Sequence, residues 1–271
     1  MSNTEGEKSP KIIIGGVVRN HELDEFYKDI ALSKKSFDSH IIAYLDFLGF
    51  AEKMREENSY ESLQILKFLL RGVKTVANQI SNTNDISVFD MKIFSDNIII
   101  AQKVEQAKFA TQAISITNLV ASVQLHALLY FGFLIRGSIT IGELSIDSTV
   151  VWGTGLIDAY NIENNLANYP RILLSKQFLN AYDSCEQKQL NLYAFAKKDF
   201  DGSWFVDFLV AAPSLTFIPT LSEILNDIAI PYANKPDKVK QKINWVIAHF
   251  NAYCHKFRER GDYEKYVLSY V

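Results

Sequence analysis

Cysteine is scarce in this chain, which has only Cys185 and Cys254 among its 271 residues. Their separation matches no metal-ligand spacing, and two free thiols fit a reducing cytoplasm. The net charge is also small, at −3, which argues against bulk binding to nucleic acid or to an anionic membrane. The five histidines share no common spacing, so a histidine-based metal site is not expected either.

A long uninterrupted apolar run is missing as well. The most apolar window runs from Ala113 to Ile135. It is broken by Asn118, Gln124 and His126, so we expect a buried helix followed by a strand instead of a membrane span. The first residues are polar and contain no apolar core, so no signal peptide is expected. With 48% hydrophobic and 22% charged residues, the composition is that of an ordinary soluble globular protein.

Proline and glycine are not concentrated in any segment, and no repeat divides the chain. We expect an N-terminal arm over 1–37, a main domain over 38–210, and a helical extension over 211–271 that packs on the same domain. The expected strands are 11–18, 40–47, 87–94, 97–103, 133–144, 149–153, 171–174, 192–198 and 203–209. The expected helices are 23–33, 49–57, 60–81, 105–130, 155–166, 219–230 and 236–260. From residue 40 the order β-α-α-β-β-α-β is that of an elaborated ferredoxin-like sheet, an α+β fold.

The strand expected at 40–47 ends in a carboxylate. It is apolar apart from Asp46, and Gly49 follows as a turn. Burying an unpaired charge in a core strand costs several kcal/mol, so Asp46 is expected at the strand end, where it can bind a ligand. A second aspartate, Asp96, stands at the turn of the expected hairpin. Together the two predict a divalent-metal site for phosphoryl chemistry, because Mg²⁺ prefers one or two carboxylates plus phosphate oxygens. For either aspartate alone, a strand-end or turn role without a ligand is the alternative.

Four segments, in the same order along the chain, resemble motifs of the class III nucleotide cyclases. Asp46-Phe47-Leu48-Gly49-Phe50 is similar to the metal-binding strand and turn of that family, D-[IVL]-x-G-F. Three further segments are similar to other motifs of the family. Lys92–Asp96 resembles K-x-x-G-D. Arg136–Gly142 resembles R-x-G-I-x-x-G with the glycine shifted by one residue, and Val151–Glu163 resembles W-G-D/T-x-V-N-x-A-x-R-x-E. The resemblance covers about residues 40–176 and implies a cyclase palm with extra C-terminal helices.

The resemblance implies that two Mg²⁺ or Mn²⁺ ions are held by Asp46 and Asp96, with the carbonyl of Phe47 completing one coordination sphere. The turn residues Leu48, Gly49 and Phe50 would cradle the triphosphate of a nucleoside triphosphate through their backbone N–H groups.

It also implies a homodimer with shared sites. Lys92 and Thr154 fall where cyclases contact the base. The two aspartates would come from one subunit, and Lys92 with the Trp152–Glu163 helix from the other.

The chain departs from the family at two transition-state positions. The asparagine of the family falls on Ile157 and the arginine falls on Asn161, and a neutral amide cannot supply the charge of a guanidinium. Either Arg136, Arg171 or another cation takes that role, or the site is degenerate. A shift along the helix would bring in other amides, Asn164 or Asn165.

These departures point toward a divergent bacterial branch that resembles the Pycsar antiphage pyrimidine cyclases. Tyr44 shares the face of Asp46 and can narrow a base pocket to a single ring; the alternative is an ordinary half-buried strand tyrosine. The resemblance implies conversion of UTP to cyclic UMP and pyrophosphate, as a signal for a separate effector that senses cyclic nucleotides. Lys92 with Thr154 would also suit adenine, so an adenylate cyclase stays open.

Two other functions stay open. One is a catalytically inactive nucleotide-binding protein that acts through a partner, which Ile157 and Asn161 favour. The other is a different phosphoryl enzyme on a palm-like sheet, such as a polymerase-like or diguanylate-type protein; the absence of a G-G-[DE]-E-F turn weakens the diguanylate form.

Several conspicuous residues are expected to be structural. We expect Arg171 to be a surface ion pair or a phosphate ligand, and the charges of 235–242 to form a solvated helix start. The expected core aromatics are Trp152, Trp204, Phe205 and Phe208.

Overall fold

The computed structural model describes residues 37–50, 52, 55, 59–186, 191–212 and 214–271. The strand expected at 11–18, the helix at 23–33 and most of the helix at 49–57 lie outside these residues. Phe37–Val271 form one unit. Its strands are β1 (Ser39–Leu48), β2 (Asp90–Phe94), β3 (Asn97–Lys103), β4 (Leu134–Glu143), β5 (Ser145–Ile146), β6 (Val151–Trp152), β7 (Ile172–Leu174), β8 (Ala196–Lys198) and β9 (Trp204–Val206). Its α-helices are α3 (Ser59–Asn84), α4 (Phe109–Phe131), α5 (Thr154–Leu166), α6 (Lys176–Asp183), α7 (Ile218–Ala229) and α8 (Asp237–Lys256).

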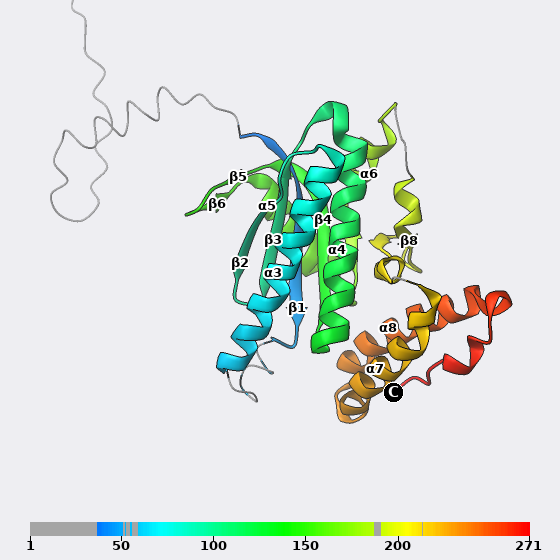
Figure 1. The fold of residues 1–271 in the computed structure, drawn as a ribbon. Helices are drawn as coiled ribbons and strands as arrows, with labels where there is room; N and C mark the ends of the chain where they lie inside the picture. The colour runs from blue at the N-terminus through cyan, green and yellow to red at the C-terminus, as the bar shows by residue number, and fades with distance from the viewer. Residues whose placement is uncertain (1–36, 51, 53–54, 56–58, 187–190, 213) are drawn as a thin grey trace, which may run out of the picture. The chain divides into compact units, whose positions relative to one another are not determined.

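The main sheet determines the fold class. Within the described residues it has seven strands in the order β2-β3-β1-β4-β7-β9-β8. Strand β1 is antiparallel to both β3 and β4, while β7 is parallel to β4. The order β2-β3-β1-β4, with α3 before β2 and α4 before β4, is the ferredoxin-like arrangement, so the predicted α+β fold is confirmed. Strands β7, β9 and β8 extend this sheet beyond β4 (Figure 1).

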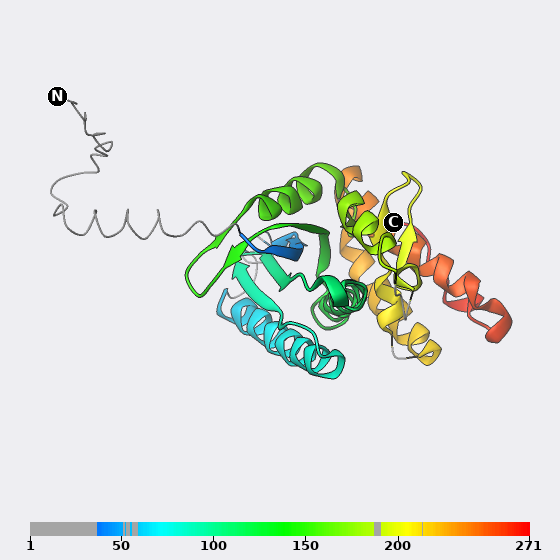
Figure 2. The same ribbon diagram turned by 90° about the horizontal axis from the view of Figure 1, so that it is seen from above.

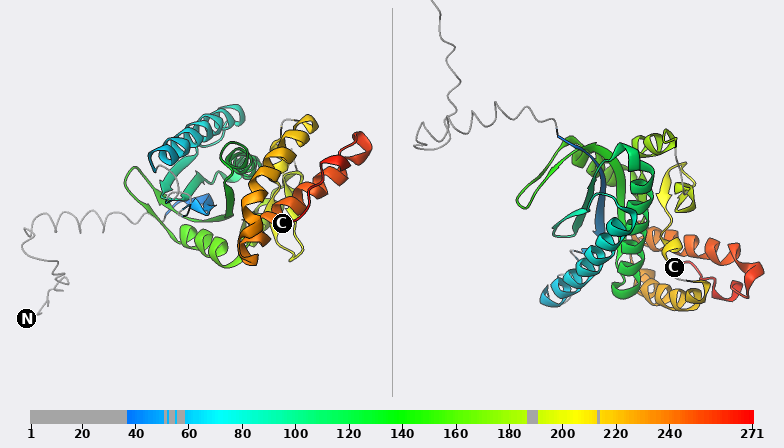
Figure 3. Two further views of the ribbon diagram at one scale, coloured as in Figure 1. Left: turned by 90° about the horizontal axis from the view of Figure 1, so that it is seen from below. Right: turned by 45° about the horizontal axis from the view of Figure 1, so that its top comes forward.

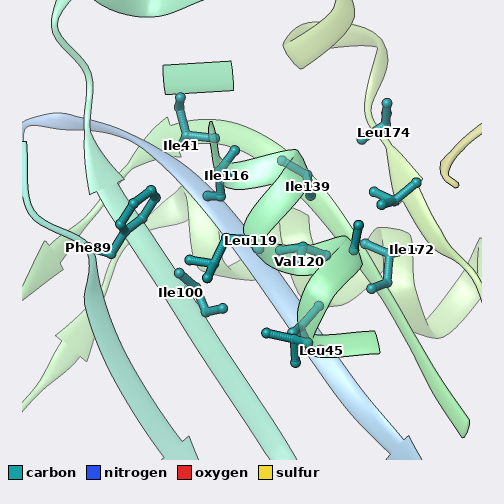
Figure 4. Packing of buried hydrophobic residues seen from close by; sticks show 14 of the residues in the cluster. Ile41, Leu45, Phe89, Ile100, Ile116, Leu119, Val120, Ile139, Ile172 and Leu174 are labelled. Carbon is teal, nitrogen blue, oxygen red and sulfur yellow. The ribbon is translucent and has the colours of Figure 1, made fainter. Parts of the chain in front are cut away.

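Helices cover both faces of the sheet, and the alternation of β1 shows why. Ile41 and Leu45 pack into the core cluster that includes residues of α3 and α4 (Figure 4). Ile42 faces the other way, in a cluster with Ala159 of α5. Successive side chains of a strand point to opposite faces of the sheet. Because the side chains on both faces of β1 are apolar and buried, the strand has to lie between two helical layers. Figure 2 shows α3 and α5 on opposite sides of the sheet.

Helix α5 lies unusually close to the sheet. A Cβ atom built on Gly142 of β4 would come within 2.5 Å of the Cα of Gly155 in α5. Only glycine at both positions permits this approach, since real Cβ atoms do not approach other atoms so closely. The next sheet-facing positions of the helix are Ala159 and Glu163, one and two turns further on.

The C-terminal helices pack at one end of the sheet. Leu125 and Leu128 of α4 and Leu134 of β4 join Leu225 of α7 and Val246 of α8 in a second apolar cluster. In Figures 1 and 3 these helices lie beside the end at which β1 finishes and β4 begins. Both helices match the spans expected at 219–230 and 236–260, although α8 ends at Lys256.

The helix α6 was not expected. It has eight residues and begins after Ser175, whose side chain accepts a hydrogen bond from the Phe178 amide at 3.0 Å. This is an ordinary N-cap, but just over two turns of helix are too few for an apolar period to be recognised in a sequence.

Three sequence expectations about aromatic and charged residues were wrong. Trp152 is 68% exposed, because the β5–β6 hairpin that carries it projects from the main sheet. Trp204 is only half-buried, although Phe205 and Phe208 are core residues as expected. The charges of 235–242 are not all solvated, since Lys242 is half-buried against the body of the protein.

The apolar window is a core helix, as expected. Among the described residues, one stretch, Gln106–Phe131, is long and apolar enough to cross a membrane, and 67% of its apolar window is buried inside the protein.

Candidate active site

The two aspartates predicted as metal ligands lie at the same end of the sheet. Asp46 stands near the end of β1, opposite Asn97 of β3. Asp96 is in the turn between β2 and β3, and its carbonyl accepts a hydrogen bond from the Phe47 amide at 3.0 Å. Because this bond joins the end of β1 to the hairpin turn, the backbone itself holds the two aspartates close together.

The turns beside both aspartates contain left-handed residues. Gly49 has a φ of 76° and Ser95 has a φ of 54°. The K-x-x-G-D pattern has glycine where this chain has Ser95, and two-residue hairpin turns require residues that tolerate positive φ. The turn therefore keeps its shape in spite of the departure from the pattern.

Arg136 is held between two carboxylates. Its Nε–H donates a hydrogen bond to Oδ2 of Asp46 at 2.8 Å, across the β1–β4 pair. Oε1 of Glu163 lies 2.7 Å from the same nitrogen, yet it accepts no hydrogen bond from the residues that the structure describes. A single N–H points at one acceptor at a time. Arg136 is therefore committed to Asp46, with Glu163 as a second partner within reach.

Glu163 is a site residue that the sequence reasoning missed. It is 2% exposed, and burial raises its pKa to about 7, with the two aspartates adding to the rise and Arg136 opposing it. A signal was present in the sequence: Gly155, Ala159 and Glu163 are spaced by four, which places the carboxylate on the sheet-facing side of α5. An acid at a core-facing helix position needs a cationic partner.

An open hollow of about 650 Å³ surrounds the aspartates. Its volume is within the range of small-molecule sites. The rings of Phe47 and Phe50 pack against Phe133, so these two residues offer the hollow mainly their backbone groups. Another hollow of about 710 Å³ lies elsewhere, beside Ser39 and Cys185. The lining of the first hollow consists of Asp46, Phe47, Leu48, Gly49, Phe50, Glu52, Arg55, Asp96 and Arg136.

The oxygen donors at this hollow fit a hard divalent ion that keeps open positions. Asp46, Asp96 and the carbonyl of Phe47 are all oxygen donors on one lining. In the described part of the chain, no three His, Cys, Asp or Glu side chains form a group that could hold a metal by themselves. Mg²⁺ and Mn²⁺ accept one or two carboxylates and fill their remaining positions with water and phosphate oxygens.

Tyr44 lies on the same face of β1 as Asp46, as expected. Its ring meets that of Tyr160 edge to face, with the centroids 5.9 Å apart. Burial raises the pKa of Tyr44 to about 12, and the charge of Glu163 adds to this effect. Tyr44 is half-buried on β1 with its polar end in the acidic part of the site, and its role in base selection stays a prediction.

The residues expected to contact the base are separate from the hollow. Lys92 is half-buried on β2, and its charge helps to lower the pKa of Asp147 in the β5–β6 hairpin, after the backbone N–H donors of that hairpin. Thr154 is exposed at the first turn of α5, and Asn161 and Ile157 are exposed further along the same helix. None of these four residues is in the lining around Asp46, so a single chain does not bring the two groups together.

Arg171 has a structural role. It is 1% exposed and forms ion pairs with Asp199 and Asp201 of the β8–β9 turn. The hydrogen bond from Arg171 lowers the pKa of Asp201 to about 2. The Trp245 indole also donates to Asp199 at 3.0 Å. Because Arg171 is buried and paired with both carboxylates, a phosphate cannot reach it. It is therefore neither the surface ion pair nor the phosphate ligand that the sequence suggested.

Comparisons with known proteins find similarity at the level of structure. No family model matches the chain, and no curated protein matches its sequence. The guanylyl cyclase domain of the RhoGC fusion protein from the fungus Blastocladiella emersonii is 11% identical, with 64% of this chain and 96% of that chain covered and a TM-score of 0.46.

Two bacterial structures also match. A light-regulated adenylyl cyclase is 15% identical over 77% of this chain and 66% of that chain, with a TM-score of 0.36. A class III adenylyl cyclase-like ATP-binding protein from Pseudomonas aeruginosa is 11% identical over 81% of this chain and 53% of that chain, with a TM-score of 0.41. Similarities of this size transfer no residue role to this chain.

Proposed function

We propose that the chain is a metal-dependent nucleotide cyclase. One observation carries the proposal: two strand-end aspartates, joined by the Phe47–Asp96 backbone hydrogen bond, face a hollow bordered by the turn that follows β1. Such a site suits an attack of the ribose 3′-oxygen on the α-phosphorus, in which the bond to the β-phosphate breaks and pyrophosphate leaves.

Each group has a defined task in this proposal. Asp46, Asp96 and the Phe47 carbonyl hold the divalent ions, which supply Lewis acidity for the 3′-hydroxyl and charge neutralisation at the α-phosphate. The backbone N–H groups around Gly49 orient the phosphates. Arg136 holds the Asp46 side chain in position through its hydrogen bond to Oδ2.

The site is completed by a second copy of the chain. The outward side of α5 exposes a stripe in which Ile157 is 59% and Tyr160 is 45% accessible, and the neighbouring hairpin exposes Trp152 and Val150. Large apolar side chains in such an arrangement favour burial against a partner. A homodimer through this face would bring Lys92 of one chain toward the aspartates of the other.

We further propose UTP as the preferred substrate and cyclic UMP as the product, which would act as a signal for a separate effector in antiphage defence. Tyr44 supports the preference for a single-ring base, because its ring stands on the face of Asp46 and is fixed there by Tyr160. The alternative substrate is ATP, which would make the protein an adenylate cyclase. The identity of the cyclic product distinguishes UTP from ATP as the substrate.

The test is turnover of an equimolar mixture of the four NTPs with Mn²⁺, followed by chromatography of the products. The proposal predicts a dominant cyclic UMP peak that disappears in Asp46→Asn. Asp90→Asn is the matched control, because Asp90 is an exposed carboxylate on the same hairpin as Asp96. A dominant cyclic AMP peak refutes the base assignment.

A nucleotide-binding protein without turnover is the second candidate. One observation favours it: Asn161 stands where the family has an arginine, and Arg136 is already bound to two carboxylates. Binding of a nucleotide to the wild-type protein with no cyclic product under any metal would establish this function in place of catalysis.

A further inference from the structure

Helix α8, outside the segment that resembles cyclases, reaches the candidate active site. Leu48 and Leu134, which pair at the end of β1, belong to the apolar cluster that contains Ile243 and Val246 of α8. The first half of this helix therefore lies against the strand ends that carry Asp46 and Arg136. Figures 1 and 3 show α8 at this end of the sheet.

Two lysines, one just before this helix and one in its first half, interact with residues that line the hollow, although neither is in the lining itself. Lys235 donates to Oε1 of Glu52 at 2.7 Å, and Glu52 is part of the hollow's lining. Lys238 and Lys242 follow on α8 with a spacing of four, so they share one side of the helix. Lys242 is half-buried and forms no ion pair with any residue in the described part of the chain.

The surroundings of Lys242 have an excess of positive charge. Its pKa is lowered first by burial, then by repulsion from Arg136 and Lys238, while Asp46 opposes the shift. These couplings mean that the Lys242 ammonium group lies within electrostatic range of the candidate site. A cation that is half-desolvated and unpaired gains most from an anionic ligand.

We propose that Lys242 binds the terminal phosphates of the nucleoside triphosphate, with Lys238 behind it as a second cation. This inference rests on the proposed function. It identifies the cation that neutralises the negative charge of the leaving pyrophosphate. Asn161 cannot do so, and Arg136 and Arg171 are both committed to carboxylates. The charge comes from the same chain as Asp46, because Lys242 interacts electrostatically with Asp46 and Arg136 within one chain.

The test measures binding of inorganic tripolyphosphate to the full chain by calorimetry in the presence of Mn²⁺. A charge-assisted contact predicts that Lys242→Gln weakens binding by about tenfold or more, whereas Lys242→Arg keeps it within about threefold. Lys240→Gln is the matched control: it lies two residues away, roughly 200° around the helix, and should bind like the wild type. Tripolyphosphate has no base, so this readout does not depend on substrate choice or turnover.

A second measurement separates the two proposals. Binding of Mn²⁺ alone, followed by electron paramagnetic resonance, should be lost in Asp46→Asn and kept in Lys242→Gln. Retention of Mn²⁺ by Asp46→Asn refutes the metal site of the proposed function. Wild-type affinity of Lys242→Gln for tripolyphosphate, or no binding by the wild type, overturns the role of Lys242. The melting temperature of each variant checks that the fold is kept.

Discussion

The buried carboxyl of Glu163 makes the stability of the protein depend on pH in a way that one substitution removes. The pKa of Glu163 is about 7 in the folded chain, against an ordinary value of 4.5. Between these values the unfolded chain has lost the proton and the folded chain still holds it. Stability therefore falls as pH rises through this window, by up to about 3 kcal/mol for one group.

Glu163→Gln mimics the protonated acid at every pH. Arg136 keeps its hydrogen bond to Asp46 in the variant, so the geometry of the site is preserved. We expect the variant and the wild type to have similar free energies of unfolding at pH 5. At pH 8 the variant should be more stable by about 2–3 kcal/mol, because the wild type then carries the buried charge.

The measurement is urea denaturation in metal-free buffer with EDTA, at both pH values. Glu143→Gln is the control, since Glu143 is an exposed carboxylate at the end of β4 and its replacement should leave the difference between the two pH values unchanged. An equal effect of Glu163→Gln at pH 5 and pH 8 would refute the reasoning. So would a loss of stability at pH 8, which would mean that the ion pair with Arg136 outweighs the burial of the charge.

Three further outcomes are expected. Asp46→Ala should reduce turnover at least about a hundredfold, equivalent to about 3 kcal/mol of barrier, and leave the circular dichroism spectrum unchanged; wild-type rates would contradict the metal assignment. Tyr44→Ala should admit purines, measured as a rise in cyclic AMP and cyclic GMP relative to cyclic UMP; an unchanged product ratio would exclude a role for this ring in selection. Arg171→Met should lower the free energy of unfolding by about 3 kcal/mol in denaturant titration, because it leaves Asp199 and Asp201 without their cation; a change near zero would show that solvent compensates the two carboxylates.

Much of the fold follows from local patterns in the sequence. The apolar run from Ile41 to Leu45 and the turn at 95–96 are sufficient to predict β1 and the β2–β3 hairpin, since a short apolar run and turn chemistry are local properties. The helix spans are predicted for the same reason. Short elements such as α6 and β5 are not, because they contain too few residues for a period to be recognised.

The candidate site was only half predictable. Asp46 and Asp96 are visible because a carboxylate after an apolar strand is locally anomalous. The contact of Arg136 with Glu163 depends on the close approach of Gly142 and Gly155, which is a property of the packed helix and sheet. The position of Lys242 depends on the packing of a helix more than a hundred residues away, and on the sequence alone its charge is indistinguishable from those of a solvated face.

The assignment of Lys242 to the chain that carries Asp46 leads to a prediction about mixed dimers. If sites are shared, mixing an Asp46→Ala chain with a Lys92→Ala chain restores up to one intact site per heterodimer, because the second chain supplies Asp46 and the first supplies Lys92. Adding Lys242→Gln to the Lys92→Ala chain should abolish this rescue, since that chain must hold the phosphates itself.

Adding the same substitution to the Asp46→Ala chain should leave the rescue intact, because the phosphates never bind to that chain in the restored site. The readout is the rate of cyclic nucleotide formation after mixing, with subunit exchange confirmed by mass spectrometry. Loss of rescue from the Asp46→Ala chain alone would place Lys242 across the dimer interface. Equal loss from both chains would mean that Lys242 supports the dimer and does not bind the phosphates.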